Sequence, residues 1–385
     1  MSILGTRVIR TEDPRLLTAG GVYVDDLSTP ELNGAARVTF VRSPVAHARI
    51  TGIDASAALA EPGVIAVLTV ADMDDLAPPP PSSGEWDGSP APLGGPWAEP
   101  LLAIDTVRFV GEPVAVVITD NRYQGEDAAD LVTVDYDPLP VVLGPTAAVS
   151  DEILLFPAAD TNVCVAQAAS ADDTPFDACD VVVERDFVNQ RVACLPMEGR
   201  AAAASFENGR LTVWVSSQNA QVSRFILAGA LGMAPDQLRV VVPDVGGGFG
   251  GKIGIDRDTI TIAWAARKTG RALRWAETRS ENLVAMTQGR SQLQHIRIGG
   301  SRDGRILAYR IDVIQDIGAY PRIGGLLPFL TCLMAPGVYD IPDVQAGFRQ
   351  AVTNTSEIRR QNKNRNLFMP ATLARLACHV NRRMT

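Results

Sequence analysis

A glycine-rich segment, GGGFGGK at residues 246–252, is the part of the sequence best suited to chemistry. Five glycines fall within six positions, so a whole turn lacks Cβ atoms and its backbone can approach a ligand closely. The backbone N–H groups of such a turn can point at an oxyanion or at a flat cofactor. Glycines also raise the entropy cost of folding, and a purely structural loop would rarely contain so many. The segment therefore predicts a cofactor-binding loop.

A phosphate-binding P-loop is one interpretation of this segment. Gly246, Gly251 and Lys252 fit the spacing G-x-x-x-x-G-K. That motif requires Ser or Thr at the next position, because the hydroxyl binds Mg²⁺. This chain has Ile253 there, which argues against an ATPase.

A dinucleotide fingerprint is the second interpretation, since residues 246–251 also fit G-x-G-x-x-G. A strand is expected before the glycines and a helix after them, and Glu277 ends the next expected strand. Pro243 and Asp244 separate the first strand from the glycines, which the fingerprint does not favour. A Rossmann-like NAD-binding oxidoreductase stays open as an alternative.

The same segment resembles the molybdopterin-contacting loop in the large subunits of the xanthine dehydrogenase, aldehyde oxidase and carbon monoxide dehydrogenase family. The resemblance implies that Gly247, Gly248, Phe249 and Gly250 lie beside the molybdenum. The segment WVSSQN is similar to the family's strand whose Gln hydrogen-bonds an oxo ligand of the metal. That role would fall on Gln218.

Further segments support this resemblance in the same order along the chain. GEPVA at 111–115, DAA at 127–129 and VDYDPLP at 134–140 are similar to the family's N-terminal hammerhead domain. Glu198 stands where the family has a Glu-Pro-Arg stretch. The resemblance covers about residues 10–356 and corresponds to the N-terminal half of such a subunit.

The family uses water to hydroxylate an aldehyde, an N-heterocycle or a related carbon centre, with the metal activating hydroxide. The resemblance implies a molybdenum–molybdopterin cofactor, of which the cytosine dinucleotide form is one option. It also implies an iron–sulfur subunit with a 2Fe–2S cluster and a FAD subunit as partners. The pterin would hold the metal, so no protein ligand to molybdenum is expected. The family's catalytic glutamate lies near the C-terminus of a full-length subunit, and no residue of this chain matches it.

Each assigned side chain suits its role and also has a plainer interpretation. A neutral Gln amide donates to an oxo ligand without adding charge beside a polyanionic cofactor, and Phe249 would exclude water from the pocket. Alternatively, Gln218 is a strand side chain with its own partners and Phe249 packs in the core. Lys252 is interpreted equally well as a solvent-exposed charge. Ile253 replaces the Glu with which some purine-oxidising members bind substrate, which weakens a purine interpretation.

Composition limits the remaining function classes. The 385 residues are enough for two domains with buried cores, and the net charge of -9 argues against nucleic-acid binding. The five cysteines form no C-x-x-C pair, so no cluster or zinc site made of protein ligands is expected. No apolar run reaches the length of a signal peptide core or a membrane span. We therefore expect a cytoplasmic protein without a membrane partner.

An α+β fold must position these residues, because strand and helix patterns are mixed without strict alternation. Residues 1–145 are predicted to form a hammerhead-type domain with a Pro-rich surface loop at 77–100, where eight of 24 residues are proline. Residues 146–179 are predicted to be a connector. The expected elements of the first domain are strands at 35–41, 64–69, 107–110, 114–119 and 131–136 and a helix at 122–131.

Residues 180–356 are predicted to form the first part of a molybdopterin-binding α+β domain, incomplete in this chain. The expected strands lie at 181–187, 201–206, 211–216, 238–242, 272–276, 292–299 and 306–315, and the expected helices at 220–231 and 259–268. The sequence thus predicts a truncated large subunit.

The last residues of the chain differ sharply from the rest. Residues 1–356 carry a net charge of -15, whereas residues 357–385 carry +6. The family continues after Thr355 with an Ala-Tyr-Arg-Gly-type segment, and this chain has SEIRRQ instead. The abrupt change favours an aberrant basic tail read in a shifted frame, and a disordered basic tail is the alternative. The product of a disrupted gene and a split subunit completed by a second chain both stay open.

Overall fold

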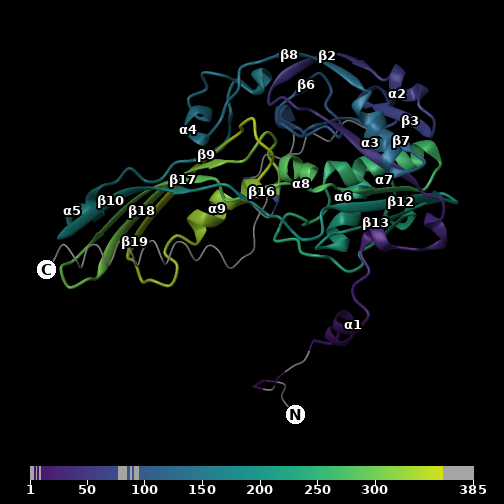
Figure 1. Ribbon diagram of the computed structural model, residues 1–385. Coiled ribbons are helices and arrows are strands. Elements are labelled where there is room, and N and C mark those ends of the chain that lie inside the picture. Colours follow the sequence, from purple (N-terminus) through teal and green to yellow (C-terminus); the bar gives the residue numbers. More distant parts are fainter. Residues whose placement is uncertain are drawn as a thin grey trace.

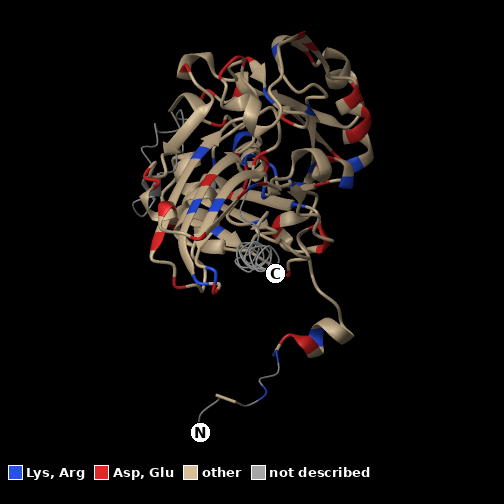
Figure 2. Ribbon diagram, turned by 90° about the vertical axis from the view of Figure 1, so that its left-hand side faces the viewer, with Lys and Arg blue, Asp and Glu red and all other residues tan. Residues whose placement is uncertain are grey.

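The computed structural model describes residues 4, 5, 7, 10–76, 85, 86, 89, 90 and 95–358. Helices and strands are mixed along these residues, which confirms the predicted α+β class. Figure 1 shows two large sheets, with shorter strands and helices above them and the first helix standing apart from the body. Basic and acidic residues are scattered over a ribbon that consists mostly of other residues (Figure 2).

The larger sheet combines strands from both predicted domains in the order β14-β13-β12-β15-β1-β7-β3. These strands are β1 (Ala36–Arg42), β3 (Val64–Thr69), β7 (Pro113–Thr119), β12 (Ala201–Glu207), β13 (Arg210–Val215), β14 (Leu238–Val241) and β15 (Leu273–Ala276). β1 runs parallel to β15, with Ala36 opposite Leu273. This pairing satisfies two strand edges that separate domains would leave open. One continuous sheet therefore joins the two predicted domains.

Helices α6 (Ala220–Leu231) and α7 (Arg257–Thr269) pack on one face of this sheet. Trp264 of α7 and Leu273 of β15 are fully buried in the core between them. Burying an apolar side chain of this size stabilises the fold by about 1.5–3 kcal/mol. The core thus fixes the starts of both helices, which lie next to the glycine-rich segment.

Both helices have the end signals that their sequences predict. Asn219 caps α6 by accepting from the N–H of Val222, and Asp256 caps α7 by accepting from the N–H of Thr259 at 2.9 Å. Each helix ends at a glycine in the left-handed conformation, which lacks the Cβ that would crowd this turn. α6 matches the predicted helix at 220–231, and α7 begins two residues before the predicted one.

The second large sheet has the order β10-β17-β18-β19-β9. Its strands are β9 (Val163–Gln167), β10 (Val181–Asn189), β17 (Gln292–Gly300), β18 (Ile306–Asp316) and β19 (Asp343–Ala351). β17 and β18 match the strands predicted at 292–299 and 306–315 and pair as a hairpin. α9 (Leu326–Leu333) covers the apolar face with Ile311 and Phe348. The predicted connector 146–179 contributes β9, which pairs with β19. Its weak sequence pattern did not reveal this strand, because pairing across the fold creates it.

A three-stranded sheet, β6-β2-β8, completes the first part of the chain. Its strands are β2 (Ala48–Asp54), β6 (Thr106–Val107) and β8 (Thr133–Pro138). The predicted strand at 107–110 stops early, because the Glu112 side chain accepts from the N–H of Arg108 and closes a turn there. The central strand β2 was not predicted. The helix predicted at 122–131 is α3 (Arg122–Asp130).

Two predicted segments lie largely outside the described residues. Of the Pro-rich loop, residues 77–84, 87, 88 and 91–94 are not described, and of the basic tail residues 359–385 are not. Glu357 and Ile358, the first residues of that tail, are buried, so the fold continues through them. Among the described residues, no helix has the length and apolar character needed to cross a membrane.

The remaining elements are short. They are α1 (Asp13–Thr18), α2 (Ser56–Ala60), α4 (Pro145–Ala148), α5 (Thr174–Asp177), α8 (Arg279–Ala285), β4 (Glu85–Trp86), β5 (Ser89–Pro90), β11 (Val192–Ala193) and β16 (Gln288–Gly289).

Candidate cofactor site

Gln218 and the glycine loop, which we define as residues 246–252, lie together at one edge of the larger sheet. Gln218 follows β13 and the loop follows β14, and these neighbouring strands run parallel with Trp214 opposite Val241. Because the carboxyl ends of parallel strands meet at the same edge of a sheet, the segments after them converge. Strand pairing therefore brings all five predicted site residues into one place.

The side chain of Gln218 holds the second half of the glycine loop. Its Oε1 accepts hydrogen bonds from the N–H of Gly250 at 3.0 Å and of Lys252 at 3.3 Å. Its own backbone N–H donates to the carbonyl of Lys252 at 2.8 Å. Nε2 makes no hydrogen bond with another described residue, and Gln218 is exposed. The amide oxygen of Gln218 thus has partners in the loop, while its Nε2 group can donate to a ligand.

The loop conformation depends on several glycines. A Cβ on Gly248 would lie 2.5 Å from Oε1 of Gln218, and φ is +96° at Gly247 and +91° at Gly250. Phe249 lies between them with φ +52°, which is uncommon for a bulky residue. It is 52% exposed, so it does not pack in the core. Backbone strain of this kind concentrates at functional sites.

Three consecutive backbone N–H groups of the loop have no acceptor in the described part of the chain. Those of Gly247, Gly248 and Phe249 make no hydrogen bond with any described residue, whereas the N–H of Gly251 donates to Gly248 at 2.8 Å. Of these three residues Gly248 is buried, and leaving a buried N–H without a partner costs about 1–3 kcal/mol. A run of such groups is suited to an oxyanion or an oxo group.

Lys252 is buried and ion-paired, so its interpretation as a solvent-exposed charge was wrong. Its Nζ donates to Oε2 and to the backbone carbonyl of Glu198, both at 2.9 Å. Burial lowers the pKa of Lys252, and Glu198 opposes that shift. This partner could not be identified from the sequence, because Glu198 lies 54 positions before Lys252 and was assigned no role.

Asp244 links residues 15–22, near the N-terminus, to the start of the glycine loop. Arg15 donates to its two carboxylate oxygens, each at 2.7 Å, and the N–H of Val22 donates at 2.8 Å. The hydrogen bonds from Arg15 and Val22 lower the pKa of Asp244 to about 2. Helix α1, which carries Arg15, has no buried residue and stands away from the body in Figure 1.

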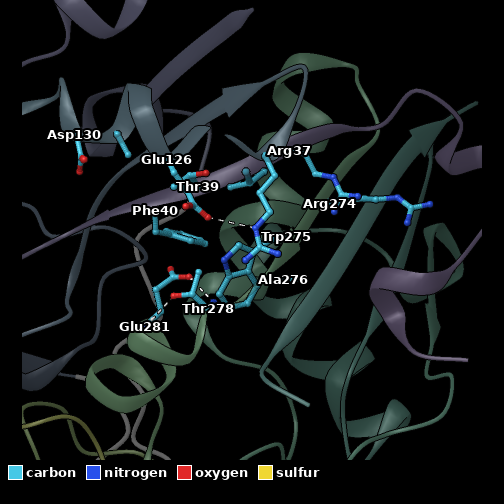
Figure 3. Close-up of a pocket in the computed structure, with 13 residues that line it drawn as sticks. Arg37, Thr39, Phe40, Glu126, Asp130, Arg274, Trp275, Ala276, Thr278 and Glu281 are labelled. Atoms are coloured by element: carbon cyan, nitrogen blue, oxygen red, sulfur yellow. Dashed lines mark hydrogen bonds and ion pairs between the residues drawn. The ribbon is translucent and has the colours of Figure 1, made fainter. Parts of the chain in front are cut away.

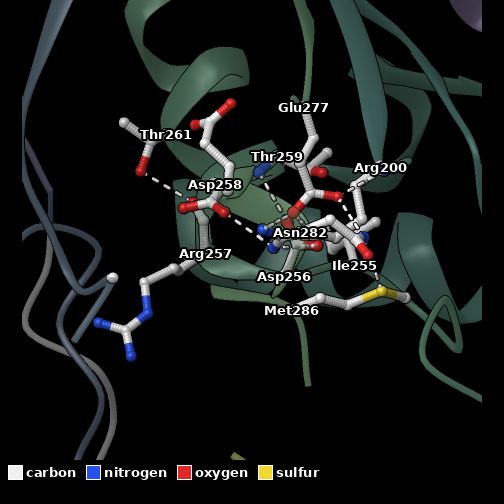
Figure 4. Close-up of polar contacts among 12 residues, drawn as sticks. Arg200, Ile255, Asp256, Arg257, Asp258, Thr259, Thr261, Glu277, Asn282 and Met286 are labelled. Atoms are coloured by element: carbon white, nitrogen blue, oxygen red, sulfur yellow. Dashed lines mark hydrogen bonds and ion pairs between the residues drawn. The ribbon is translucent and has the colours of Figure 1, made fainter. Parts of the chain in front are cut away.

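A buried group of charges surrounds the first residues of α7, directly after the loop, and Figure 4 draws part of it. We call it the α7 cluster, and it contains Arg42, Glu99, Glu112, Arg200, Asp256, Arg257, Asp258, Glu277 and Glu357. Arg200 donates to Glu277 at 2.6 Å and lies 2.8 Å from Asp258. Burial alone would lower the pKa of Arg200, but the surrounding carboxylates raise it well above its usual value.

Arg257 extends the α7 cluster to the first part of the chain and to its last described residues. Its Nη atoms lie 2.5 Å from Glu99, 3.0 Å from Glu112 and 3.3 Å from Glu357. Burial raises the pKa of Glu99 to about 8, Arg257 opposes this shift, and Glu357 adds to it. Sequence reasoning missed the cluster, because its members come from seven separate segments without a shared motif.

Two protein families match this sequence. Residues 155–359 match the molybdopterin cofactor-binding domain, and residues 18–140 match the a/b hammerhead domain of aldehyde oxidase and xanthine dehydrogenase. The chain belongs to the xanthine dehydrogenase and aldehyde oxidase family. The family predicted from the glycine loop and its companion segments is thereby confirmed.

Named members of this family are similar over nearly the whole chain. The nicotine 6-hydroxylase large subunit of Paenarthrobacter nicotinovorans is 36% identical, over 92% of this chain and 43% of the relative. The carbon monoxide dehydrogenase large chain of Hydrogenophaga pseudoflava is 33% identical, over 90% and 44%. The crystal structure of quinoline 2-oxidoreductase from Pseudomonas putida 86 superposes with a TM-score of 0.87 at 33% identity, over 99% of this chain and 49% of that one.

The chain spans about half the length of these curated relatives. A shorter relative also occurs in the family. The nicotinate dehydrogenase large molybdopterin subunit of Eubacterium barkeri is 28% identical, over 91% of this chain and 79% of that relative.

A pocket of about 310 Å³ in this family member lies away from the glycine loop (Figure 3). The pocket lies between β1 and β15, beyond their last paired residues, Arg37 and Arg274. The rings of Phe40 and Trp275 pack edge to face beside it, with centroids 5.4 Å apart. Arg37 is paired with Asp25 at 2.6 Å. None of the five predicted site residues lines the pocket.

The strand order does not favour the Rossmann alternative for this molybdopterin-family chain. A dinucleotide fold places the strand after its first helix next to the strand before the glycines. Here β13 and β12 lie between β14 and β15, and β12 runs antiparallel to both of its neighbours. In the part of the chain that is described, no group of three or more His, Cys, Asp or Glu could hold a metal ion.

Proposed function

We propose that residues 180–356 supply one wall of a molybdopterin site in the large subunit of a molybdenum hydroxylase. The residues that would hold the cofactor are Gln218, Gly247, Gly248, Phe249 and Gly250. The observation that carries this proposal is the run of three unbonded N–H groups at 247–249 beside the exposed amide of Gln218.

This donor set suits a polyanionic cofactor. Backbone N–H groups are fixed in place and cannot be deprotonated, so they support an oxo or oxyanion group without adding charge. Gly248 has no side chain, so the N–H groups of the loop and the side-chain amide of Gln218 lie next to each other. The exposed ring of Phe249 would exclude water from the same surface.

A bound molybdopterin cofactor would supply water activation and redox capacity for hydroxylating an aldehyde, an N-heterocycle or a related carbon centre. The names of two relatives, a nicotine hydroxylase and a quinoline oxidoreductase, favour an N-heterocycle as substrate. We further propose the cytosine dinucleotide form of the cofactor. An iron–sulfur subunit and a FAD subunit would receive the electrons.

The proposed site needs groups that residues 1–385 do not supply. No residue here matches the family's catalytic glutamate, and the second wall would come from sequence corresponding to the other half of the longer relatives. We propose that the basic tail, residues 357–385, follows a shift of reading frame. Sequencing the coding DNA around codons 350–385 tests this, because an Ala-Tyr-Arg-Gly-like continuation should then appear in another frame. An unchanged sequence without such a continuation would favour a split subunit completed by a second chain.

The cofactor proposal is tested by equilibrium dialysis of the purified chain against isolated molybdopterin cofactor, with molybdenum and released pterin measured. We expect weak, substoichiometric binding that Gln218→Leu abolishes. Gln221→Leu, at an exposed position on the neighbouring helix α6, is the matched control and should bind as the wild type does. Tight binding of one full equivalent would contradict the half-site. Saturable NAD binding without pterin binding would favour the dinucleotide alternative.

A further inference from the structure

One residue outside the glycine loop contacts both of its ends. Oε2 of Glu198 accepts from the N–H of Gly246 at 2.8 Å and from Nζ of Lys252 at 2.9 Å. The backbone of Glu198 repeats this arrangement, since its N–H donates to the carbonyl of Gly246 at 3.1 Å and its carbonyl accepts from Lys252 at 2.9 Å. Four contacts thus fix the distance between the first and last residues of the loop.

The Glu198–Lys252 pair is almost fully removed from water. Lys252 has a side-chain exposure of 1% and Glu198 of 13%. For such a pair the cost of desolvation offsets most of the attraction, so its contribution to fold stability is small even when its geometry is good. A buried pair of this kind is better explained by the single arrangement it selects. The fit is also tight, because a Cβ on Gly246 would lie 2.5 Å from Cβ of Glu198.

Gln218 and Glu198 hold different parts of the loop. Gln218 accepts from Gly250 and Lys252 and makes no contact of this kind with residues 246–249. Glu198 therefore holds the start of the first half at Gly246, while the N–H of Gly251 holds the carbonyl of Gly248. This half contains the N–H groups of residues 247–249, which have no acceptor among the described residues.

We infer that Glu198 and Lys252 are positioning residues that keep residues 247–249 open, with their N–H groups available to a ligand. Without the pair, the ends of the loop separate and the backbone relaxes toward conformations that bond to water or to itself. The effect on loop geometry rests on the contacts above. Its consequence for cofactor binding rests on the proposed function.

Hydrogen–deuterium exchange of the full chain tests the inference, read on peptides within residues 243–254. The N–H groups of Gly250 and Gly251 bond to Gln218 and Gly248, so faster exchange there reports a changed loop and not a lost side-chain partner. We expect at least about tenfold faster exchange in Lys252→Met, because the loop then opens more often. Glu198→Gln should have a smaller effect, because its amide oxygen still accepts.

Three comparisons make the exchange result specific. The double variant should exchange no faster than Lys252→Met, since partners in one interaction are not additive. Lys252→Arg should restore slow exchange. Lys268→Met, which removes a surface ion pair with Asp74, is the matched control and should leave the loop unchanged. Unchanged exchange in Lys252→Met, or an equal rise in peptides of α7, would overturn the positioning role.

A second measurement separates this inference from the proposed function. Molybdenum retained after dialysis should fall in Lys252→Met by at least about tenfold, in line with the opening of the loop. If the wild-type chain retains none, the proposed function fails while the exchange result still decides the loop geometry. Retention equal to the wild type in a variant whose loop exchanges faster would overturn the link between the ion pair and the cofactor.

Discussion

The glycine loop and the α7 cluster are neighbours in the chain, but they differ in whether their polar groups have partners within the protein. In the loop, the N–H groups of residues 247–249 have no acceptor among the residues that the structure describes, and Phe249 is exposed. In the cluster, Arg200 contacts three carboxylates and Arg257 three others, all largely buried. N–H groups without an acceptor are available to bind a ligand, whereas buried ion pairs hold distant segments of the chain together.

This contrast predicts that stability and binding can be separated by mutation. The α7 cluster joins β1, the start of α7 and the last described residues, so damage to it should affect the whole fold. The loop contributes little buried apolar surface, so damage to it should affect ligand binding more than folding.

The largest expected effect comes from breaking the cluster with Arg200→Met. It leaves Glu277 and Asp258, with side-chain exposures of 0% and 3%, without their main partner. Removing one member of a buried pair costs about 3–5 kcal/mol, so the free energy of unfolding measured in urea should fall by that amount. Arg122→Met removes an exposed pair with Glu126 and should cost at most about 0.5 kcal/mol. Equal losses in the two variants would remove the distinction between the cluster and the surface.

A loop variant, Gly248→Ala, should impair ligand binding more than it lowers the stability of the fold. Its Cβ would meet the end of the Gln218 side chain at 2.5 Å, so that side chain must move and lose two hydrogen bonds. We expect a loss of about 1–3 kcal/mol in unfolding free energy, together with loss of pterin binding in dialysis. Gly229→Ala on α6, where a Cβ meets nothing within 4 Å, should keep binding and gain stability. Normal pterin binding by Gly248→Ala would contradict the proposed contact surface.

The position of the loop could be predicted from sequence, whereas the position of the cluster could not. Gly247, Gly248 and Gln218 belong to short contiguous motifs, and a strand before a glycine turn fixes where such a turn lies. No local pattern links Arg200 with Glu277, and the pairing of β12 with β15 brings them together. Local signals find loops and helix ends, while contacts between distant segments depend on the whole fold.

The same reasoning explains the errors in the predicted elements. Helix α6 matched its prediction, because its cap and its apolar spacing are local. Strands β2 and β9 were missed, since their pairing partners supply what their sequences lack. Lys252 was misjudged for a related reason, because a lysine after glycines carries no mark of the distant Glu198 that buries it.

A smaller effect is expected when the pH changes the charge of the cluster. Burial raises the pKa of Glu99 from 4.5 to about 8, so the folded protein holds this proton where the unfolded chain has lost it. The resulting stabilisation is fully present below pH 4.5 and is lost as the pH rises through about 8. Glu99→Gln cannot titrate, so urea unfolding should show wild-type stability falling relative to this variant across that window. Glu126→Gln, on the surface of α3, is the control. A constant difference between wild type and Glu99→Gln would contradict the raised pKa.

The smallest effect on stability is expected outside both regions, at the exposed contact between Arg15 and Asp244. Arg15→Ala should leave the urea midpoint at pH 7 close to wild type, because exposed ion pairs are screened by water and contribute little. The lowered pKa of Asp244, about 2, means that its contribution to stability is present above its ordinary pKa of 3.8 and is lost as the pH falls through about 2.

The structural change in Arg15→Ala should be confined to the segment that carries α1. α1 has no buried residue, so its release should speed proteolytic cleavage within residues 10–22 while the body of the protein stays intact. If Arg15→Ala instead lowered the free energy of unfolding as much as Arg200→Met does, exposure would not distinguish the two kinds of ion pair, and the contrast between loop and cluster would lose its physical basis.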